Sequence, residues 1–258
     1  MILPVVVLFF AGQSDTPQTH ERLAKTYETS GQLDKAAAEY ERAIQLSPYE
    51  ESYYFKAAQM YLLRQQFDPA VQILERGCKM FDKSAQLALA LGVGYYGERR
   101  FDQAANAFLR TIDIDPDVEQ PYLFLTRMLD QAGDRLPEIL PRFKRWATAN
   151  PKNAMAQFAY AKAQVASGDE QAGEKLLRES IALKGGQWES HYELGILLER
   201  QRKFAEAAGE LERAVAINAE QADAHYHLSR VYDRLGQSDK AAAERRIHER
   251  LTQANGVK

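Results

Sequence analysis

The feature that most constrains this chain is a residue pattern that returns every 34 positions. Units of this length begin at residues 17, 51, 85, 119, 154, 188 and 222 and together cover residues 17–255, and the fourth unit has one extra residue. A constant period of this size is typical of proteins that stack copies of one small supersecondary unit. The period therefore predicts a row of similar units that share a continuous core.

Small and large side chains alternate within each unit at helical spacing. The eighth residue of the unit is small in all seven copies, and the eleventh is large. In the second half of the unit, the twentieth residue is small and the twenty-fourth is large and apolar in six copies each. At 3.6 residues per turn, each set lies on one stripe of a helix, and the small residues let two helix axes approach to about 8–10 Å. Each unit is therefore predicted to be a hairpin of two helices. The eighth residues are Ala24, Ala58, Gly92, Thr126, Ala161, Gly195 and Ser229.

Residues that favour turns and helix ends separate these stripes. Glycines follow the first helix, where a left-handed cap is expected, aspartates stand where the second helix needs an N-cap, and prolines end the second helix. The glycines are Gly31, Gly133, Gly168 and Gly236; the aspartates are Asp34, Asp68, Asp102 and Asp239; the prolines are Pro48, Pro116 and Pro151.

Three units carry the fuller motif of a known family. The first reads HERLAKTY, AAAEYERA and then Pro48; the third reads ALALGVGY, AANAFLRT and then Pro116; the sixth reads HYELGILL and AAGELERA. With these motifs the chain resembles the tetratricopeptide repeat family. The resemblance implies an all-α fold, a right-handed superhelical solenoid of about seven helical hairpins. Units four and five depart most from the pattern, with Trp146 where a small residue is expected and Pro137 and Pro141 opening a helix.

The repeat also predicts the domain boundaries. The last unit carries Arg245 where the others have a large apolar residue, and no proline follows it, so we expect it to end the solenoid as a polar cap. The seven expected units are 17–50, 51–84, 85–118, 119–153, 154–187, 188–221 and 222–255.

The first twelve residues, MILPVVVLFFAG, differ from the rest of the chain. This apolar run is shorter than the roughly 20 residues that cross a bilayer, but it suits the apolar region of a secretory signal. We therefore expect residues 1–12 to direct export to the periplasm or the medium, with 13–16 as a short linker. No Lys or Arg precedes the run, so the alternative is an apolar cap on the first repeat of a cytoplasmic protein.

Composition and motifs argue against several classes of function. With 33 basic and 36 acidic residues the chain has no net field that would attract nucleic acid. Cys78 has no evident partner for nucleophilic catalysis, and neither His20 nor His248 has a second histidine four residues later to complete a zinc motif. His225 and His227 point about 200° apart on a helix. We expect a non-catalytic protein without metal or cofactor.

The family resemblance implies that the first helices line a concave face that binds a partner. The residues at the corresponding positions are mostly apolar or aromatic, with a few cations, which favours a protein or peptide with apolar or aromatic anchors and nearby acidic groups. The alternative is that some of these side chains only widen the hairpin core. The candidate binding residues are Phe55, Gln59, Leu62, Leu89, Val93, Tyr96, Leu123, Phe124, Arg127, Phe158, Lys162, Tyr192, Ile196, Tyr226 and Arg230.

A second hypothesis is a ligand-binding or enzymatic solenoid whose pocket forms at the irregular fourth unit. It would need a compact cluster of ionisable groups near Arg127, Asp130 and Lys162.

Overall fold

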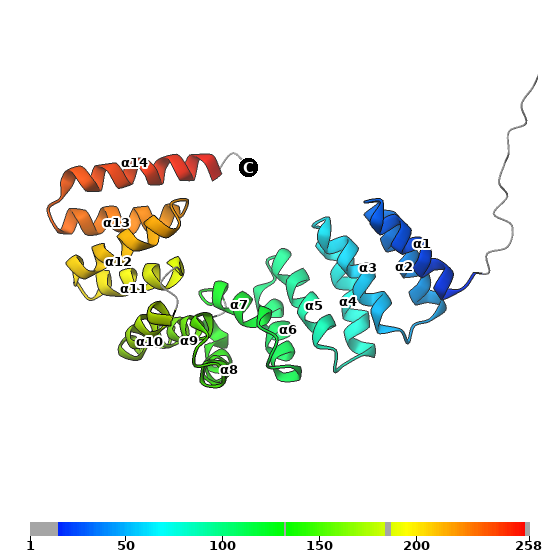
Figure 1. The fold of residues 1–258 in the computed structure, drawn as a ribbon. Helices are drawn as coiled ribbons and strands as arrows, with labels where there is room; N and C mark the ends of the chain where they lie inside the picture. Colours follow the sequence, from blue (N-terminus) through cyan, green and yellow to red (C-terminus); the bar gives the residue numbers. More distant parts are fainter. Residues whose placement is uncertain (1–14, 132, 184–186, 256–258) are drawn as a thin grey trace, which may run out of the picture. The chain divides into compact units, whose positions relative to one another are not determined.

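The computed structural model describes residues 15–131, 133–183 and 187–255 (Figure 1). All regular secondary structure in these residues is helical, with fourteen α-helices and one short 3-10 helix, so the predicted all-α fold is confirmed. None of these helices is long and apolar enough to cross a membrane. The apolar segment 1–12 lies outside the described residues, and its role as a signal stays a prediction.

The chain divides into two compact units, Met1–Pro121 and Tyr122–Lys258. In the N-terminal unit each helix packs against the next one in the sequence, and α3 also contacts α5. The helices of this unit are α1 (Pro17–Thr29), α2 (Leu33–Leu46), α3 (Glu51–Leu63), α4 (Phe67–Met80), α5 (Ala85–Gly97) and α6 (Phe101–Ile114).

The C-terminal unit follows the same plan, with consecutive helices in contact from α8 to α14 and α11 also touching α13. Most of α7 (Gln120–Arg127) belongs to this unit, where Tyr122 stacks on Trp146 of α8 at 4.3 Å between ring centroids. The remaining helices are the 3-10 helix η1 (Gly133–Arg135), α8 (Leu136–Ala149), α9 (Ala154–Ala166), α10 (Glu170–Leu183), α11 (Trp188–Arg200), α12 (Phe204–Ile217), α13 (Ala222–Arg234) and α14 (Ser238–Asn255).

The fourth hairpin is the irregular one, as the sequence indicates. Its first helix, α7, has 8 residues where the first helices of the other hairpins have 13, and it begins at Gln120, one residue after the expected start. A turn and η1 then lead into α8, which has Pro137 in its first turn and Pro141 inside it. A proline in the first turn is tolerated because the N–H it lacks has no helical partner there.

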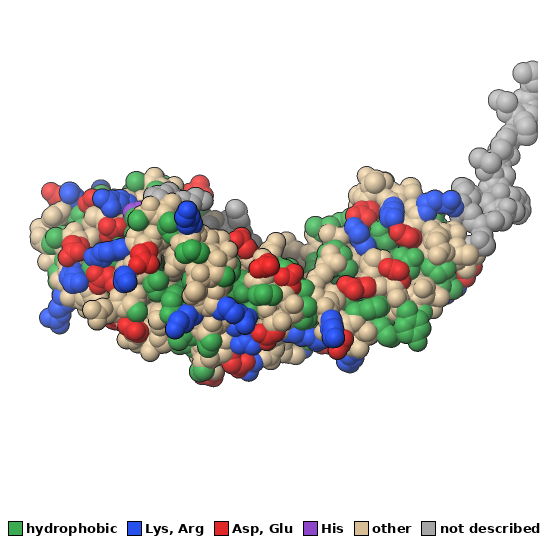
Figure 2. Space-filling model, turned by 60° about the horizontal axis from the view of Figure 1, so that its bottom comes forward, with side chains coloured by type: hydrophobic (Ala, Val, Ile, Leu, Met, Phe, Trp, Pro, Cys, Tyr) green, Lys and Arg blue, Asp and Glu red, His purple; other side chains and the backbone are tan. Residues whose placement is uncertain are grey.

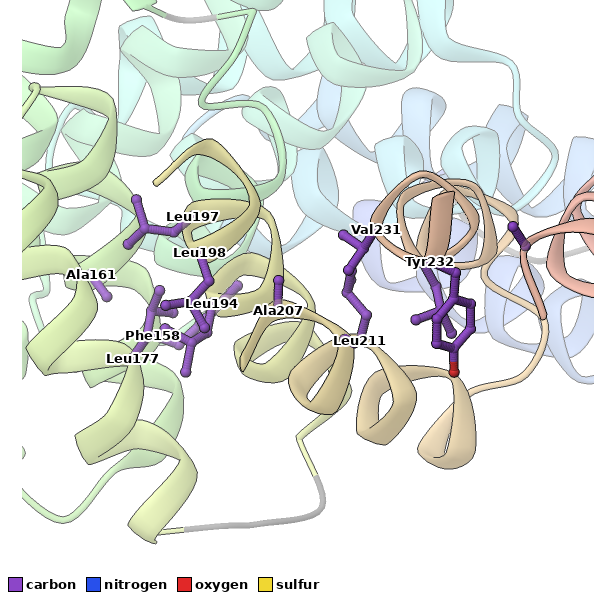
Figure 3. Close-up of a cluster of buried hydrophobic side chains, with 13 residues drawn as sticks. Phe158, Ala161, Leu177, Leu194, Leu197, Leu198, Ala207, Leu211, Val231 and Tyr232 are labelled. Carbon is purple, nitrogen blue, oxygen red and sulfur yellow. The ribbon is translucent and has the colours of Figure 1, made fainter. Parts of the chain in front are cut away.

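The eighth and twenty-fourth residues of a unit meet inside the hairpin, which is the packing that the small residues predict. A Cβ atom added to Gly92 would lie 2.5 Å from the Phe108 ring, and one added to Gly195 would lie 2.6 Å from Leu211 Cγ. Because glycine has no side chain, the two helices of these hairpins lie closer together than a larger residue at this position would allow. Figure 3 shows the cluster around Leu194 and Leu211, to which α9, α10, α11, α12 and α13 contribute buried side chains.

Three of the four predicted glycine caps have the left-handed backbone. Gly31, Gly168 and Gly236 have φ values of 73°, 92° and 72°, and Gly133 instead opens η1. The same position of the unit is left-handed in three further hairpins, although it carries a side chain there. Those residues are Gln65, Arg99 and Arg202, with φ values of 59°, 61° and 61°.

The prediction that Asp34, Asp68, Asp102 and Asp239 are N-caps is wrong. The second helices begin earlier, so these aspartates lie in the first turn and the cap of α2 is Gln32, which makes no side-chain cap hydrogen bond. A carboxylate in the first turn still interacts favourably with the positive end of the helix dipole. Side-chain caps occur instead on first helices, including Thr16 before α1 and Asn153 before α9, and on the second helix α10, where the Asp169 carboxylate accepts from the Ala172 N–H at 3.0 Å.

The last helix, α14, has the polar character expected of an end unit. It runs for 18 residues, and Ala241 is the one buried side chain among those that the structure describes on this helix. Arg245, which replaces a large apolar residue, is exposed and pairs with Asp233 at 2.6 Å.

Candidate functional site

The histidines at the fourth position of three units are structural. In each of these hairpins the imidazole Nδ1 forms a hydrogen bond with a glutamate 19 residues later on the second helix, at 2.5–2.6 Å. The contact recurs at the same position of three units, and in each of them it links the two helices of the hairpin. The pairs are His20–Glu39, His191–Glu210 and His225–Glu244.

Tyrosines at the eleventh position link successive hairpins in the same periodic way. Tyr61 and Tyr95 each donate a hydrogen bond of 2.6 Å to a glutamate of the preceding second helix, Glu41 and Glu75. Burial, followed by that carboxylate, raises the pKa of both phenols to about 12. These tyrosines are therefore protonated packing residues and not acid–base groups.

Cys78 is buried on α4, and burial raises the pKa of its thiol to about 11. A thiol with a raised pKa is a poor nucleophile at neutral pH. Among the described residues, no group of three or more His, Cys, Asp and Glu side chains is arranged to hold a metal ion.

In the N-terminal unit, the structure brings the candidate residues of α3 and α5 together. The two helices pack side by side, and a Cβ atom added to Gly94 would lie 3.9 Å from Leu62 Cδ2. All six candidates on these helices are half-buried, so each presents part of its side chain outside the core. They are Phe55, Gln59, Leu62, Leu89, Val93 and Tyr96.

In the C-terminal unit, one candidate is misplaced. Phe158 has 5 % of its surface exposed and packs in the core with Leu177 and Leu194, so the interpretation of it as a binding residue is wrong. It lies on α9, in a cluster with buried side chains of α10 and α11. The alternative, in which such a side chain widens the hairpin core, holds here.

The other candidates of this unit are more accessible. Leu123 and Phe124 on α7, Lys162 on α9, and Tyr192 and Ile196 on α11 are half-buried. Arg127, Tyr226 and Arg230 are exposed, and 43 % of the Tyr226 surface is accessible.

Five rings from three helices form a connected aromatic surface in the C-terminal unit. Trp188 and Tyr192 lie 5.9 Å apart, Tyr192 lies 5.9 Å from His227, and Tyr226 lies 5.5 Å from His227 and 5.4 Å from His248. We call these five residues the aromatic surface. Sequence reasoning found its two tyrosines but missed Trp188, His227 and His248. Trp188 lies one helical turn before Tyr192 on α11, and the packing of α11, α13 and α14 brings His227 to Tyr192 and His248 to Tyr226.

The two histidines of the HxH pair do point apart, as helical geometry predicts. His225 is buried and bonds to Glu244 of α14, while the Nδ1 of His227 lies 2.8 Å from Glu199 of α11. Glu199 also pairs with Arg230 at 3.2 Å, and the Arg230 guanidinium lies 5.7 Å from the centre of the Tyr226 ring. The cation is thus held beside the aromatic surface.

The ionisable groups named for the fourth-unit hypothesis have other surroundings. Lys162 pairs with Glu193 of α11 at 3.0 Å, and Arg127 and Asp130 are both exposed. This arrangement does not favour a catalytic pocket built from these three residues.

Two cavities of the structure arise from the repeat itself. One, of about 220 Å³, is lined by Tyr95 and Arg110 among others, and the other, of about 480 Å³, by Leu198 and Arg213. Tyr95 and Leu198 are both the eleventh residue of their unit, and Arg110 and Arg213 are both the twenty-sixth. The same gap between neighbouring second helices therefore appears in both units of the chain.

A third cavity, of about 260 Å³, has a different character. It lies in the C-terminal unit, at the ends of α11 and α13 and the start of α12, and four of its six lining residues are arginines. We call it the arginine pocket; it is lined by Glu199, Arg200, Arg202, Phe204, Arg230 and Arg234. Figure 2 shows Lys and Arg side chains interspersed with acidic ones on the visible face of the molecule.

Comparison with known proteins identifies the type of repeat. Family models described as tetratricopeptide repeat match residues 17–60 and 192–251. Among curated proteins, none matches this sequence.

Solved structures with this fold include a tetratricopeptide repeat protein from Parabacteroides merdae ATCC 43184, at 12% identity and a TM-score of 0.70, covering 92% of this chain and 94% of that one. YrrB, described as "a TPR protein with an unusual peptide-binding site", matches at 14% identity and a TM-score of 0.56 over 72% of this chain and 95% of its own. MamA from Desulfovibrio magneticus RS-1 matches at 16% identity and a TM-score of 0.55 over 66% and 96%.

Proposed function

Because this chain belongs to the tetratricopeptide repeat family, we propose that it is a non-catalytic scaffold that binds a peptide or protein segment along its first helices. The observation that carries the proposal is the aromatic surface of the C-terminal unit, where Tyr226 remains 43 % exposed beside other rings and a cation. Aromatic residues and arginine are enriched where proteins bind one another. The peptide-binding site named for YrrB is a precedent within the same fold.

The aromatic surface suits a binding role because its rings are ordered before a partner arrives. Tyr226 contacts His227 and His248, and Arg230 lies over its ring. A side chain that is already held in one orientation loses little conformational entropy on binding. Tyrosine also combines a large apolar area with a hydroxyl group that can accept or donate a hydrogen bond.

These features specify the chemistry of the partner. The exposed Tyr226 ring and the half-buried rings beside it favour an apolar or aromatic anchor, and the cations Arg230 and Arg127 favour a nearby carboxylate. The half-buried row on α3 and α5, from Phe55 to Tyr96, is a second and more apolar binding face within the N-terminal unit.

The test is selection of binding peptides from a random dodecapeptide library on the full chain, followed by affinity measurements on variants. Tyr226→Ala should weaken the selected peptides by at least about tenfold, since aromatic anchors dominate interface energies. Tyr49→Ala is the matched control, because Tyr49 is 79 % exposed in the turn between α2 and α3 and belongs to neither face. If the selected peptides bound to Tyr226→Ala and Tyr192→Ala as tightly as to the unaltered chain, and the helicity of the variants were unchanged, the binding site would have to lie elsewhere.

Export remains part of the proposal and has its own test. Residues 1–16 can be fused to a reporter enzyme that is active only after export from a bacterial host. We expect activity from the fusion, and loss of it when Val6 and Leu8 are both replaced by Asp, because charges shorten the apolar run. An inactive fusion with the unaltered segment would contradict export.

A further inference from the structure

We propose that the arginine pocket binds a carboxylate side chain of an acidic peptide, and thereby selects the partner of the C-terminal unit. The inference rests on the scaffold function proposed above and adds a specificity site to it. The pocket adjoins the aromatic surface, because Arg230 both lines the pocket and lies over the Tyr226 ring.

The pocket carries an excess of positive charge. Its one carboxylate, Glu199, has a side chain that is 10 % exposed and is already engaged by His227 at 2.8 Å and Arg230 at 3.2 Å. Arg200 pairs with Glu170 outside the pocket at 3.3 Å. Within the part of the chain that the structure describes, no carboxylate lies within 4.0 Å of a guanidinium nitrogen of Arg202 or Arg234.

Local structure explains only some of these arginines. Arg200 and Arg234 stand in the last turns of α11 and α13, where a cation interacts favourably with the negative end of the helix dipole. Arg202 lies beyond α11 with φ at 61°, in the left-handed region that is strained for a residue with a side chain. Glycine occupies this position in four other hairpins, three of them with the same left-handed backbone. A glycine here would relieve the strain, but it would remove a guanidinium from the pocket.

The size of the pocket favours a side chain as the occupant. At about 260 Å³ it falls below the range of roughly 300–1,000 Å³ found for pockets that enclose whole small molecules. The guanidinium group presents parallel N–H donors that match a carboxylate, and Phe204 offers an apolar wall to the methylene groups. A peptide lying on the aromatic surface could therefore place a Glu or Asp side chain in the pocket.

The test uses three acetylated and amidated hexapeptides as probes, hexaglutamate, hexaglutamine and a hexapeptide of phosphoserine, with affinities measured calorimetrically on the full chain. We expect hexaglutamate to bind and hexaglutamine not to bind. The double variant R202Q/R234Q should bind hexaglutamate at least about tenfold more weakly, because charge-assisted bidentate hydrogen bonds are lost. The control R246Q/R250Q removes the same charge from exposed sites on α14 outside the pocket and should change affinity less than about twofold.

Three results would overturn the proposal: no binding of hexaglutamate, equal losses in the two double variants, or binding of the phosphoserine peptide more than tenfold tighter than hexaglutamate. Arg202→Gly provides a variant that removes the guanidinium while relaxing the backbone, so loss of folding cannot imitate loss of binding. Hexaglutamate has no aromatic anchor. If aromatic peptides are selected but hexaglutamate does not bind, the pocket is refuted and the proposed binding at the aromatic surface stands. If hexaglutamate binds but no aromatic peptide is selected, binding at the aromatic surface is refuted and the pocket stands.

Discussion

The same substitution, glycine to alanine, should have opposite effects at two sites of the C-terminal unit. Gly236 follows α13 with φ at 72°, while Gly209 lies inside α12. At both sites a new Cβ atom would meet no heavy atom within 4 Å. Packing therefore contributes almost nothing to either change, and the backbone conformation alone decides the sign.

The expected magnitudes follow from the backbone. Left-handed conformation costs an L-residue roughly 1–2 kcal/mol, and the lower entropy of the unfolded chain returns about 0.4–1 kcal/mol, so Gly236→Ala should destabilise by about 1 kcal/mol. In α12, alanine is the better helix former by about 1 kcal/mol, so Gly209→Ala should stabilise by that amount. The two variants should differ by about 2 kcal/mol in the free energy of unfolding, or about 4–8 °C in melting temperature for a chain of this size.

The assay is thermal and urea unfolding followed by circular dichroism at 222 nm. Gly31→Ala tests the same geometry in the N-terminal unit, because Gly31 has φ at 73° and equally open surroundings, and it should behave as Gly236→Ala does. If Gly236→Ala and Gly209→Ala moved the melting temperature in the same direction, the assignment of the left-handed cap would be refuted.

Three further predictions concern packing and ionisation. Ala24→Phe should overpack the fully buried contact of the first hairpin and cost about 1–3 kcal/mol, and an unchanged melting temperature would argue against this packing. Tyr61 and Tyr95 have pKa values of about 12 in the fold, against about 10 in the unfolded chain. The two phenols therefore make their full contribution to the free energy of unfolding below pH 10, and this contribution is lost as the pH rises towards 12. Between these pH values, unfolding should release phenolic protons, and the tyrosinate formed would be detected by its absorbance at 295 nm. Cys78 should react with a disulfide reagent at pH 8 only after denaturant is added, because the native thiol is buried and its pKa is about 11; rapid labelling of the native protein would contradict this.

Much of the fold could be predicted because it depends on steric contacts that recur at short sequence spacing. The meeting of Gly195 with Leu211, 16 residues later, follows from the small and large residues of one unit. The left-handed caps at Gly31 and Gly236 follow in the same way from residue type. The misplaced aspartate caps show the limit of this reasoning, since a helix start depends on the dihedral angles of Gln32 and its counterparts rather than on the nearest residue with capping ability.

The sequence by itself therefore determined the repeat, the hairpins and the row of candidate positions, because helical period and side-chain volume act within a single unit. Only the tertiary structure decided that Phe158 is core while Tyr226 is surface, although both occupy the fifth position of a unit. It also decided that His227 lies beside Tyr192 and His248 beside Tyr226, and that Arg202 of one hairpin lies with Arg230 and Arg234 of the next. Whether a side chain is exposed, and which charged groups lie near it, depends on the side chains that a neighbouring hairpin supplies. The position of a residue within its own repeat therefore predicts neither.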